Sequence, residues 1–296
     1  MSLPEKCGYI AIIGRPNVGK STLLNALLGQ KISITSPKPQ TTRWQVLGIK
    51  TKEHIQAVFI DTPGLHNTEK HAINRYMNKL ASAYIHDADV ILFMIEALRW
   101  TEEDAMVLER LKDVNAPLFL VINKVDKVKD KSALLPFINK LQTLCNFAQI
   151  IPISANKGNN LTVLENKIME CLPEGPHLYP KDEITDKNVR FLIAEIIREK
   201  LIYATEQEIP YSSTVTIENF QPGEKRTEIS AIIWVEREGQ KAIIVGAKGE
   251  KLKQIGTRAR KEIEALLKDK VYLSLWVKVK ERWTDDDRAL KSLGYE

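Results

Sequence analysis

The sequence lacks any long hydrophobic run, and it has little cysteine and little excess charge. No stretch of eighteen consecutive apolar residues occurs among its 296 residues, which argues against a transmembrane helix. The residues before Tyr9 also lack the apolar core of a signal peptide. The three cysteines are odd in number and far apart, which favours reduced thiols over disulfides or a metal site. A formal charge of +5 is by itself weak support for an anionic partner.

The composition is that of a globular protein, with 44% apolar and 27% charged residues. In the first half, apolar runs at 9–14, 55–60, 90–95, 118–122 and 150–153 predict strands. They alternate with segments of helical spacing at 20–28, 73–85, 104–112 and 133–144. Continuous apolar strands that alternate with helices predict a mostly parallel α/β sheet covered on both faces.

The pattern changes after a segment rich in proline, glycine and charge. We predict a first domain over residues 1–175, a linker over 176–187 and a second domain over 188–296. In the second domain we expect helices at 189–203 and 250–267, and strands at 213–220, 228–236 and 271–280. This is the pattern of a compact α+β unit.

Residues 14–21 read Gly-Arg-Pro-Asn-Val-Gly-Lys-Ser, which fits the P-loop pattern between a predicted strand and a predicted helix. Its glycines let the backbone N–H groups wrap a phosphate. Lys20 would reach the β- and γ-phosphates, and Ser21 would ligate Mg²⁺. The residues predicted to contact nucleotide here are Gly14, Arg15, Pro16, Asn17, Val18, Gly19, Lys20, Ser21 and Thr22.

A P-loop alone binds either ATP or GTP, and the motif formed by Asn123, Lys124 and Asp126 favours GTP. It follows a predicted strand, at the edge of the sheet where ligands bind. The Asp126 carboxylate would accept two hydrogen bonds from guanine. Adenine would leave that carboxylate unpaired.

Two weaker matches, each compatible with an ordinary loop, fall in the expected order. Asp61, at the end of a strand, would hold Mg²⁺ through water, and the Gly64 N–H would sense the γ-phosphate. The Ala155 N–H would meet the guanine oxygen. The predicted contacts are Asp61, Thr62, Pro63, Gly64, Leu65, Ser154, Ala155 and Asn156.

Residues 32–44 should supply a threonine that bridges Mg²⁺ and the γ-phosphate, and we favour Thr42, with Thr41 as the alternative. Such a segment is expected to become ordered only with the γ-phosphate present. The predicted metal ligands are therefore Ser21, Thr42 and Asp61.

Together these residues resemble the translation-factor-like bacterial GTPases and, within them, the Era family. The resemblance covers nearly the whole chain. It includes residues 14–21, 40–43, 61–65, 123–126 and 154–156, and the run 236–241 that leads into Gly-Ala-Lys-Gly at 246–249. It implies a Ras-like P-loop NTPase fold followed by a type II KH domain. It also implies GTP hydrolysis with Mg²⁺, binding of 16S rRNA near its 3′ end, and a role in assembly of the small (30S) ribosomal subunit. The implied location is the cytoplasm, with peripheral association at the inner membrane, and we expect a monomer.

Leu65 stands where Ras-like proteins carry a catalytic glutamine, so we expect slow intrinsic hydrolysis. Catalysis is then predicted to rest on Lys20, Thr42, Gly64 and Asn17. Asn17 is the candidate ligand for a K⁺ ion that would offset developing charge, as in similar GTPases without the glutamine.

The glycine-rich loop at 246–249 would clamp about four nucleotides of single-stranded RNA between two helices. Residues 237–261 carry eight Lys or Arg against two Glu, whereas residues 181–296 carry 22 basic and 21 acidic residues. The positive charge thus gathers around the loop, as in a nucleic-acid footprint, although a solvated helix face is the alternative. The predicted RNA contacts are Gly246, Ala247, Lys248, Gly249, Lys251, Lys253 and Arg258. Trp276 could stack on a base, but we favour a packing role.

Two other functions are compatible with parts of this pattern. A constitutive RNA-binding assembly factor would use its nucleotide site only for structure, but Lys20, Ser21, Thr42 and Asp61 serve phosphate and Mg²⁺ rather than folding. A membrane-remodelling GTPase would need a hydrophobic insertion segment, which the sequence lacks.

Overall fold

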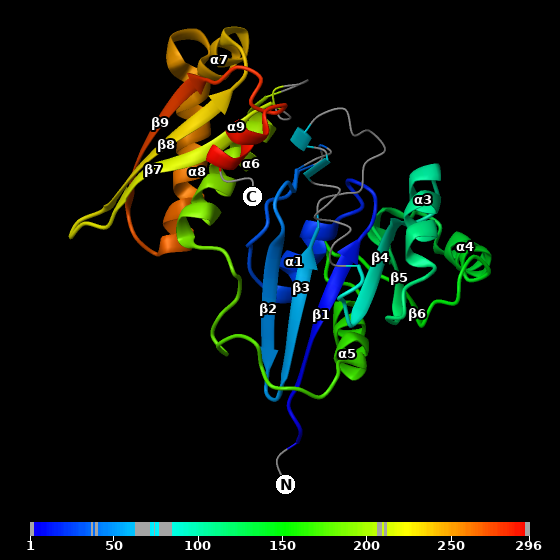
Figure 1. The fold of residues 1–296 in the computed structure, drawn as a ribbon. Coiled ribbons are helices and arrows are strands. Elements are labelled where there is room, and N and C mark those ends of the chain that lie inside the picture. The colour runs from blue at the N-terminus through cyan, green and yellow to red at the C-terminus, as the bar shows by residue number, and fades with distance from the viewer. Residues whose placement is uncertain are drawn as a thin grey trace. The chain divides into compact units, whose positions relative to one another are not determined.

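The computed structural model describes residues 3–36, 38, 41–62, 72–73, 75–76, 85–205, 209 and 212–293. The chain divides into two compact units (Figure 1). The first comprises Met1–Ser33, Thr42–Thr68 and Tyr76–Asp186, and the second comprises Ile34–Thr41, Glu69–Arg75 and Lys187–Glu296. No helix within the described residues is both long enough and apolar enough to span a bilayer.

The first unit is built on a six-stranded sheet in the order β2-β3-β1-β4-β5-β6. The strands are β1 Lys6–Ile13, β2 Val46–Lys52, β3 Ile55–Asp61, β4 Val90–Glu96, β5 Leu118–Asn123 and β6 Gln149–Pro152. Neighbouring strands are parallel except β2 and β3, which are antiparallel. The mostly parallel sheet is confirmed. The antiparallel strand β2 was not predicted, because its second half is polar.

Helices cover both faces of this sheet. They are α1 Lys20–Leu28, α3 Glu102–Leu111, α4 Leu134–Leu141 and α5 Leu161–Cys171, of which α5 was not predicted. Leu111 and Leu141 join the core formed with β1, β4 and β5. On the other face α1 contacts β2, β3 and α5. Gly48 of β2 allows this approach, since a Cβ there would lie 2.5 Å from Cδ1 of Leu24. Most of the helix expected at 73–85 lies outside the described residues.

The segment predicted as a linker is hydrogen-bonded to the first sheet. The Leu178 and Tyr179 N–H groups donate to Oε1 of Gln56 at 2.8 and 2.9 Å, and the Ile49 N–H donates to the Ile184 carbonyl at 2.8 Å. Gln56 is completely buried in the apolar strand β3. A buried amide needs hydrogen-bond partners, and this segment supplies them. The chain is therefore fixed along the first unit as far as Asp186, whose carboxylate accepts from the Leu47 N–H at 3.0 Å.

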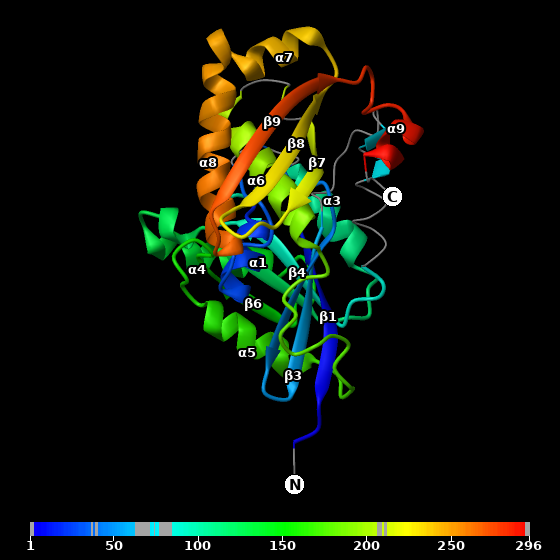
Figure 2. The ribbon, with the colours of Figure 1, turned by 90° about the vertical axis from the view of Figure 1, so that its left-hand side faces the viewer.

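The second unit has the element order α-β-β-α-α-β. Its elements are α6 Val189–Ala204, β7 Thr214–Gln221, β8 Thr227–Val235, α7 Glu238–Val245, α8 Glu250–Leu267, β9 Val271–Val279 and the unpredicted α9 Asp287–Ser292. The sheet order is β7-β8-β9, with β7 antiparallel and β9 parallel to β8. One face packs on α6 and α8, and α8 runs alongside β9 (Figure 2). Both predicted fold classes are confirmed.

Two tryptophans of the second unit differ from expectation. Trp276 on β9 is 61% exposed, so the favoured packing role is wrong. Trp283, for which no role is predicted from the sequence, is fully buried and donates its indole N–H to the Ser212 carbonyl at 3.2 Å. Leu290 and Leu293 in the C-terminal segment are buried as well.

Candidate functional site

The P-loop at 14–21 joins the end of β1 to the start of α1. Lys20 is only 6% exposed, and its ammonium donates to the carbonyls of Gly14 at 2.9 Å and Arg15 at 3.1 Å. Burial lowers the pKa of Lys20 to about 8, although the Asp61 carboxylate acts in the opposite direction. A buried ammonium whose hydrogen bonds go to neutral carbonyls is stabilised when an anion binds.

Gly19 fixes the distance between the P-loop and the end of β5. Its φ is 108°, and a Cβ there would lie 2.3 Å from Nδ2 of Asn123, so only glycine fits. The same Nδ2 donates to the Val18 carbonyl at 2.8 Å. Asn17 has a φ of 64°, a conformation that asparagine tolerates, and lies exposed on the loop. The phosphate loop and the start of the Asn123 motif are therefore held together.

The predicted metal ligands meet beside the P-loop. The Ser21 hydroxyl donates to Oδ2 of Asp61 at 2.7 Å and lies 2.8 Å from the Thr42 hydroxyl. Asp61 is completely buried, its other oxygen Oδ1 has no hydrogen-bond partner among the described residues, and burial raises the pKa of its carboxyl group. An unsatisfied buried carboxylate oxygen beside two hydroxyls fits a hard cation such as Mg²⁺. In the described part of the chain no cluster of three His, Cys, Asp or Glu could hold a metal by itself, so phosphates would have to complete the coordination.

The hydroxyls of the two candidate threonines point to different partners. Thr42 reaches Ser21, as described above. The Thr41 hydroxyl instead donates to the Lys38 carbonyl at 2.7 Å and lies 2.5 Å from the Ser36 hydroxyl. The Thr41 carbonyl accepts a hydrogen bond from the buried Arg198 guanidinium. This arrangement favours Thr42 over Thr41 as the metal ligand.

The predicted base-recognition residues come together where β5 and β6 end. The Ala155 N–H donates to Oδ1 of Asn123 at 3.0 Å, and the Ser154 hydroxyl donates to Oδ1 of Asp126 at 2.6 Å. Lys124, which lies between Asn123 and Asp126 in the chain, adopts a φ of 67° and turns the backbone there. No described residue bonds to the second oxygen of the Asp126 carboxylate, which leaves that oxygen for a ligand. Asn156 is exposed and follows directly.

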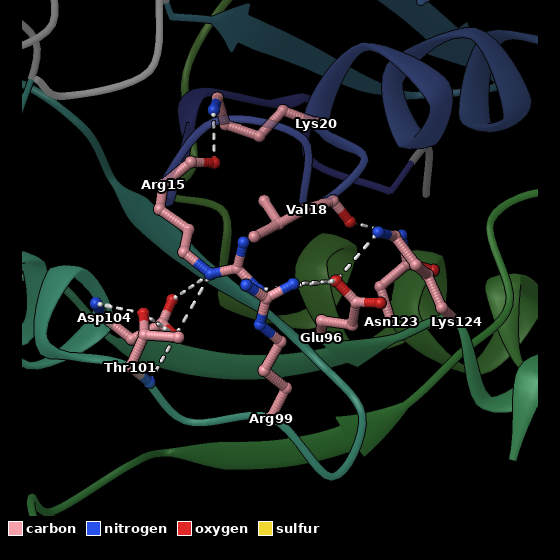
Figure 3. Close-up of polar contacts among 9 residues, drawn as sticks. All are labelled: Arg15, Val18, Lys20, Glu96, Arg99, Thr101, Asp104, Asn123 and Lys124. Carbon is pink, nitrogen blue, oxygen red and sulfur yellow. Dashed lines mark hydrogen bonds and ion pairs between the residues drawn. The ribbon is translucent and has the colours of Figure 1, made fainter. Parts of the chain in front are cut away.

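The Arg15 side chain does not line the nucleotide site formed by the P-loop and the base-recognition residues. Its guanidinium donates to Oδ2 of the buried Asp104 at 3.2 Å and lies 3.4 Å from Oε2 of Glu96 (Figure 3). The Lys124 ammonium lies 3.0 Å from the same Glu96 oxygen. Burial would raise the pKa of Glu96, but the Lys124 and Arg15 charges outweigh it and lower that pKa. Glu96 thus joins the phosphate loop to the base-recognition loop, a link that the sequence did not reveal because the three residues are far apart in the chain.

Some residues predicted to contact the nucleotide make other contacts or lie outside the described residues. The Thr62 hydroxyl donates to the Ile12 carbonyl of β1 at 3.0 Å. Pro16 and Thr22 are half-buried at the loop and at the first turn of α1. Pro63, Gly64 and Leu65 lie outside the described residues, so their roles stay predictions.

In the second unit, the loop at 246–249 connects α7 to α8 in left-handed conformations. The φ angles of Gly246, Lys248 and Gly249 are 71°, 50° and 79°. A Cβ at Gly246 would lie 2.7 Å from Cβ of Lys251, so glycine is required there. The loop therefore exposes its backbone without side chains at either end.

A groove of about 420 Å³ runs from this loop between α8 and β9. Gly249 and the predicted Lys253 line it, together with Arg260, which we had not named as a contact. Lys251 and Arg258 do not line the groove, because they lie on a different stripe of α8. The 3.6-residue period of α8 separates the groove-lining residues from Lys251 and Arg258, but only once the strand that faces the helix is known.

Comparisons with known proteins identify the family of each unit. Residues 9–124 match the family described as 50S ribosome-binding GTPase, and residues 208–284 match the KH domain family. The chain is 55% identical to GTPase Era of Pseudomonas fluorescens (strain Pf0-1) over 98% of its own length and 97% of that protein. The chain belongs to the Era family of GTPases.

Two solved Era structures have the same fold over nearly the whole chain. One is described as Era in complex with MgGDPNP and nucleotides 1506–1542 of 16S ribosomal RNA. It is 44% identical, with a TM-score of 0.95 over 98% of this chain and 99% of that one. The other is a variant of Aquifex aeolicus Era bound to GDP.AlF4⁻, with the same identity and coverage and a TM-score of 0.94. This Era-family chain is therefore a GTPase with a C-terminal KH domain, as the sequence predicted.

The position of Glu96 in this Era-family GTPase leads to a prediction about nucleotide affinity. Glu96→Gln removes the charge that both Arg15 and Lys124 face, which should weaken GTP and GDP binding equally, by about 1 kcal/mol or roughly fivefold. Turnover at saturating GTP should not change, because the base-recognition loop serves both nucleotides alike. Titration calorimetry and single-turnover hydrolysis provide the two readouts.

The matched control is Glu109→Gln, which removes an exposed ion pair between α3 and Lys112, the residue that follows this helix. It should leave both nucleotide affinities unchanged. A Glu96→Gln protein that binds GTP and GDP like the wild type, or that loses turnover at saturation, would show that Glu96 does not position the base loop.

Proposed function

We propose that this protein is a GTP-controlled RNA-binding switch that binds 16S rRNA near its 3′ end and assists assembly and maturation of the 30S subunit. The observation that carries the proposal is the presence, in one chain, of a phosphate, metal and guanine site and a KH groove lined by Lys253 and Arg260. The Era structure that contains 16S rRNA supports the small subunit as the binding partner in this proposal. The family named for 50S binding matches only residues 9–124, so we give its name less weight.

In this proposal residues 1–175 form the GTPase domain, 176–187 connect it, and 188–296 bind RNA. The backbone of 14–19 and Lys20 hold the phosphates, and Ser21, Thr42 and Asp61 hold Mg²⁺. The orphan oxygen of Asp61 supports the last assignment. When bound, Mg²⁺ neutralises phosphate charge as it develops. Asn123, Lys124, Asp126, Ser154 and Ala155 select guanine.

RNA affinity measured in GDP and in a non-hydrolysable GTP analogue tests the switch. We expect the two nucleotides to give different affinities for a single-stranded RNA from the 3′ end of 16S rRNA. Equal affinities would instead favour a constitutive RNA-binding factor whose nucleotide site is only structural. Absence of RNA binding in both states would refute the RNA-binding role itself.

The K⁺ proposal rests on Asn17, which lies exposed on the P-loop. If its side chain helps to hold K⁺ near the phosphates, hydrolysis should be several-fold faster in K⁺ than in Na⁺ at equal ionic strength. Asn17→Ala should abolish the difference and leave GTP affinity nearly unchanged. Equal rates in the two salts would remove K⁺ from the mechanism.

We further propose that the protein works as a monomer in the cytoplasm, with peripheral contact at the cytoplasmic face of the inner membrane. Family membership supports the location. Sedimentation of the purified protein tests whether it is a monomer, and fractionation of cells tests its location. A stable dimer, or a protein found only in the membrane fraction after a high-salt wash, would contradict these assignments.

A further inference from the structure

A second basic surface lies at the far end of α8 from the glycine-rich loop. It is an open hollow of about 1010 Å³, lined by Lys225, Arg260, Glu264, Lys268, Asp269 and Lys270. We call it the basic hollow. None of its residues belongs to the loop at 246–249, and neither sequence motifs nor nucleotide chemistry assigned it a role.

Hydrogen bonds between chain segments fix the shape of the basic hollow. The Thr227 N–H at the start of β8 donates to the Lys270 carbonyl at 2.9 Å, and the Thr227 hydroxyl donates to Oδ2 of Asp269 at 2.7 Å. Lys268 ends α8 in a left-handed conformation, with a φ of 54°. The β7–β8 turn, which carries Lys225, is therefore held beside the turn that follows α8.

The charges of the basic hollow are unbalanced. Its two carboxylates are occupied by neutral donors. Glu264 accepts from the Val271 N–H at 3.2 Å, and Asp269 accepts from the Thr227 hydroxyl and from the Lys270 N–H at 2.7 Å. Among the described residues, no ion pair reaches any of the four cations Lys225, Arg260, Lys268 and Lys270.

Neighbouring cations of the same unit behave differently. Arg226 pairs with Glu228 at 3.0 Å, and Lys278 pairs with Glu218 at 3.6 Å. Unpaired cations gathered around a hollow, next to paired cations outside it, are the arrangement that attracts an anion.

The basic hollow continues the groove that starts at the glycine-rich loop. Arg260 lines both, and Gly249, Lys253, Gly256 and Arg260 follow one stripe of α8 at helical spacing. Along the helix axis, Gly249 and Lys268 are roughly 28 Å apart. A KH clamp holds about four nucleotides. A strand that leaves the clamp along α8 would therefore reach Arg260 and then the hollow.

We propose that the basic hollow is a second phosphate-binding site, which takes the backbone of the same RNA strand beyond the nucleotides in the clamp. The inference rests on the proposed RNA-binding function and extends its footprint. Lysines hold phosphates as point charges and read no bases. The basic hollow should thus add affinity and salt dependence for long RNA without adding sequence preference.

The test uses the full chain with two single-stranded RNAs from the 3′ end of 16S rRNA. One has about five nucleotides and the other about fifteen, with the short sequence at its centre. Lys268→Glu with Lys270→Glu should weaken binding of the long RNA at least tenfold, leave the short RNA within twofold of wild type, and reduce the salt slope for the long RNA by about one. The matched control is Lys278→Glu with Lys291→Glu, which changes the net charge equally outside the hollow and the groove.

The outcomes separate the two proposals. If the wild type binds neither RNA, the RNA-binding function fails. Suppose that the wild type binds both RNAs and that the basic-hollow variant binds the long RNA as well as the control does. The second site is then refuted, and an acidic protein becomes the better partner for the basic hollow. Equal losses for both RNAs would also refute it. Circular dichroism checks folding, and Lys268→Gln with Lys270→Gln should give a smaller loss confined to the long RNA.

Discussion

Changing Ala247 and Lys248 to aspartate should lower RNA affinity by about 3 kcal/mol, or roughly a hundredfold. The double change removes one positive charge and adds two negative charges where the loop is expected to face the RNA backbone. Phosphate repulsion and the loss of counterion release both act against binding, so the defect should depend on salt. This is the largest effect that we expect in the second unit.

The loop should keep its conformation in this variant. Gly246 and Gly249, at φ of 71° and 79°, are untouched. Lys248 lies at a φ of 50°, in the left-handed region that aspartate tolerates better than most residues. GTP affinity should stay near the wild-type value, because the nucleotide phosphates are assigned to 14–21 in the first unit.

The measurement combines RNA and GTP titrations on the double variant, with circular dichroism to check folding. Lys278→Asp, which reverses one exposed charge outside the groove, is the control and should bind RNA normally. Unchanged RNA affinity in a folded double variant would refute the assignment of 246–249 to RNA. Any stimulation of hydrolysis by RNA should disappear together with RNA binding.

Replacing Asp126 by asparagine should reverse the choice of base. The Asp126 carboxylate is positioned by the Ser154 hydroxyl at 2.6 Å and presents two acceptor oxygens to the two guanine N–H groups. An amide has one acceptor oxygen, and its NH₂ group would face a guanine N–H donor, which should cost about 3 kcal/mol in GTP affinity. The same amide can donate to the 2-oxygen of xanthine, so xanthosine triphosphate should become the preferred ligand.

Competition between GTP and xanthosine triphosphate measures this effect directly. Asp130→Asn is the matched control, since it makes the same chemical change at an exposed residue that caps the turn at Lys131–Ala133. It should keep the preference for GTP. An Asp126→Asn protein that also keeps this preference would show that Asp126 does not read the base.

Much of the fold followed from local patterns, and the failures have identifiable causes. The central strands were predicted within a few residues, because strands buried on both faces have continuous apolar sequences. Strand β2 was missed because Lys50, Thr51 and Lys52 give it a polar second half. Trp276 was assigned to packing because its strand alternates. Alternation identifies two faces but not which one is covered.

The sequence alone determined the chemistry of the nucleotide site. A P-loop is a strand, a turn and a helix that are contiguous in the chain, so Gly14, Lys20 and Ser21 need no distant partner to take their places. The Asn123–Asp126 motif is equally local. The glycines of 246–249 likewise specify their own left-handed turns.

Other features depended on contacts between residues far apart in the chain. The geometric support for Thr42, which the sequence already favoured over Thr41, came from which hydroxyl lies beside Ser21. The role of Arg15 came from Asp104 and Glu96 on neighbouring elements. The four cations of the basic hollow come from a turn, a helix and a loop, and their lack of ion pairs with described residues is visible only once the sheet has formed. A sequence lists which charges are present, but electrostatic and hydrogen-bond energies depend on the distances between atoms, and folding fixes those distances.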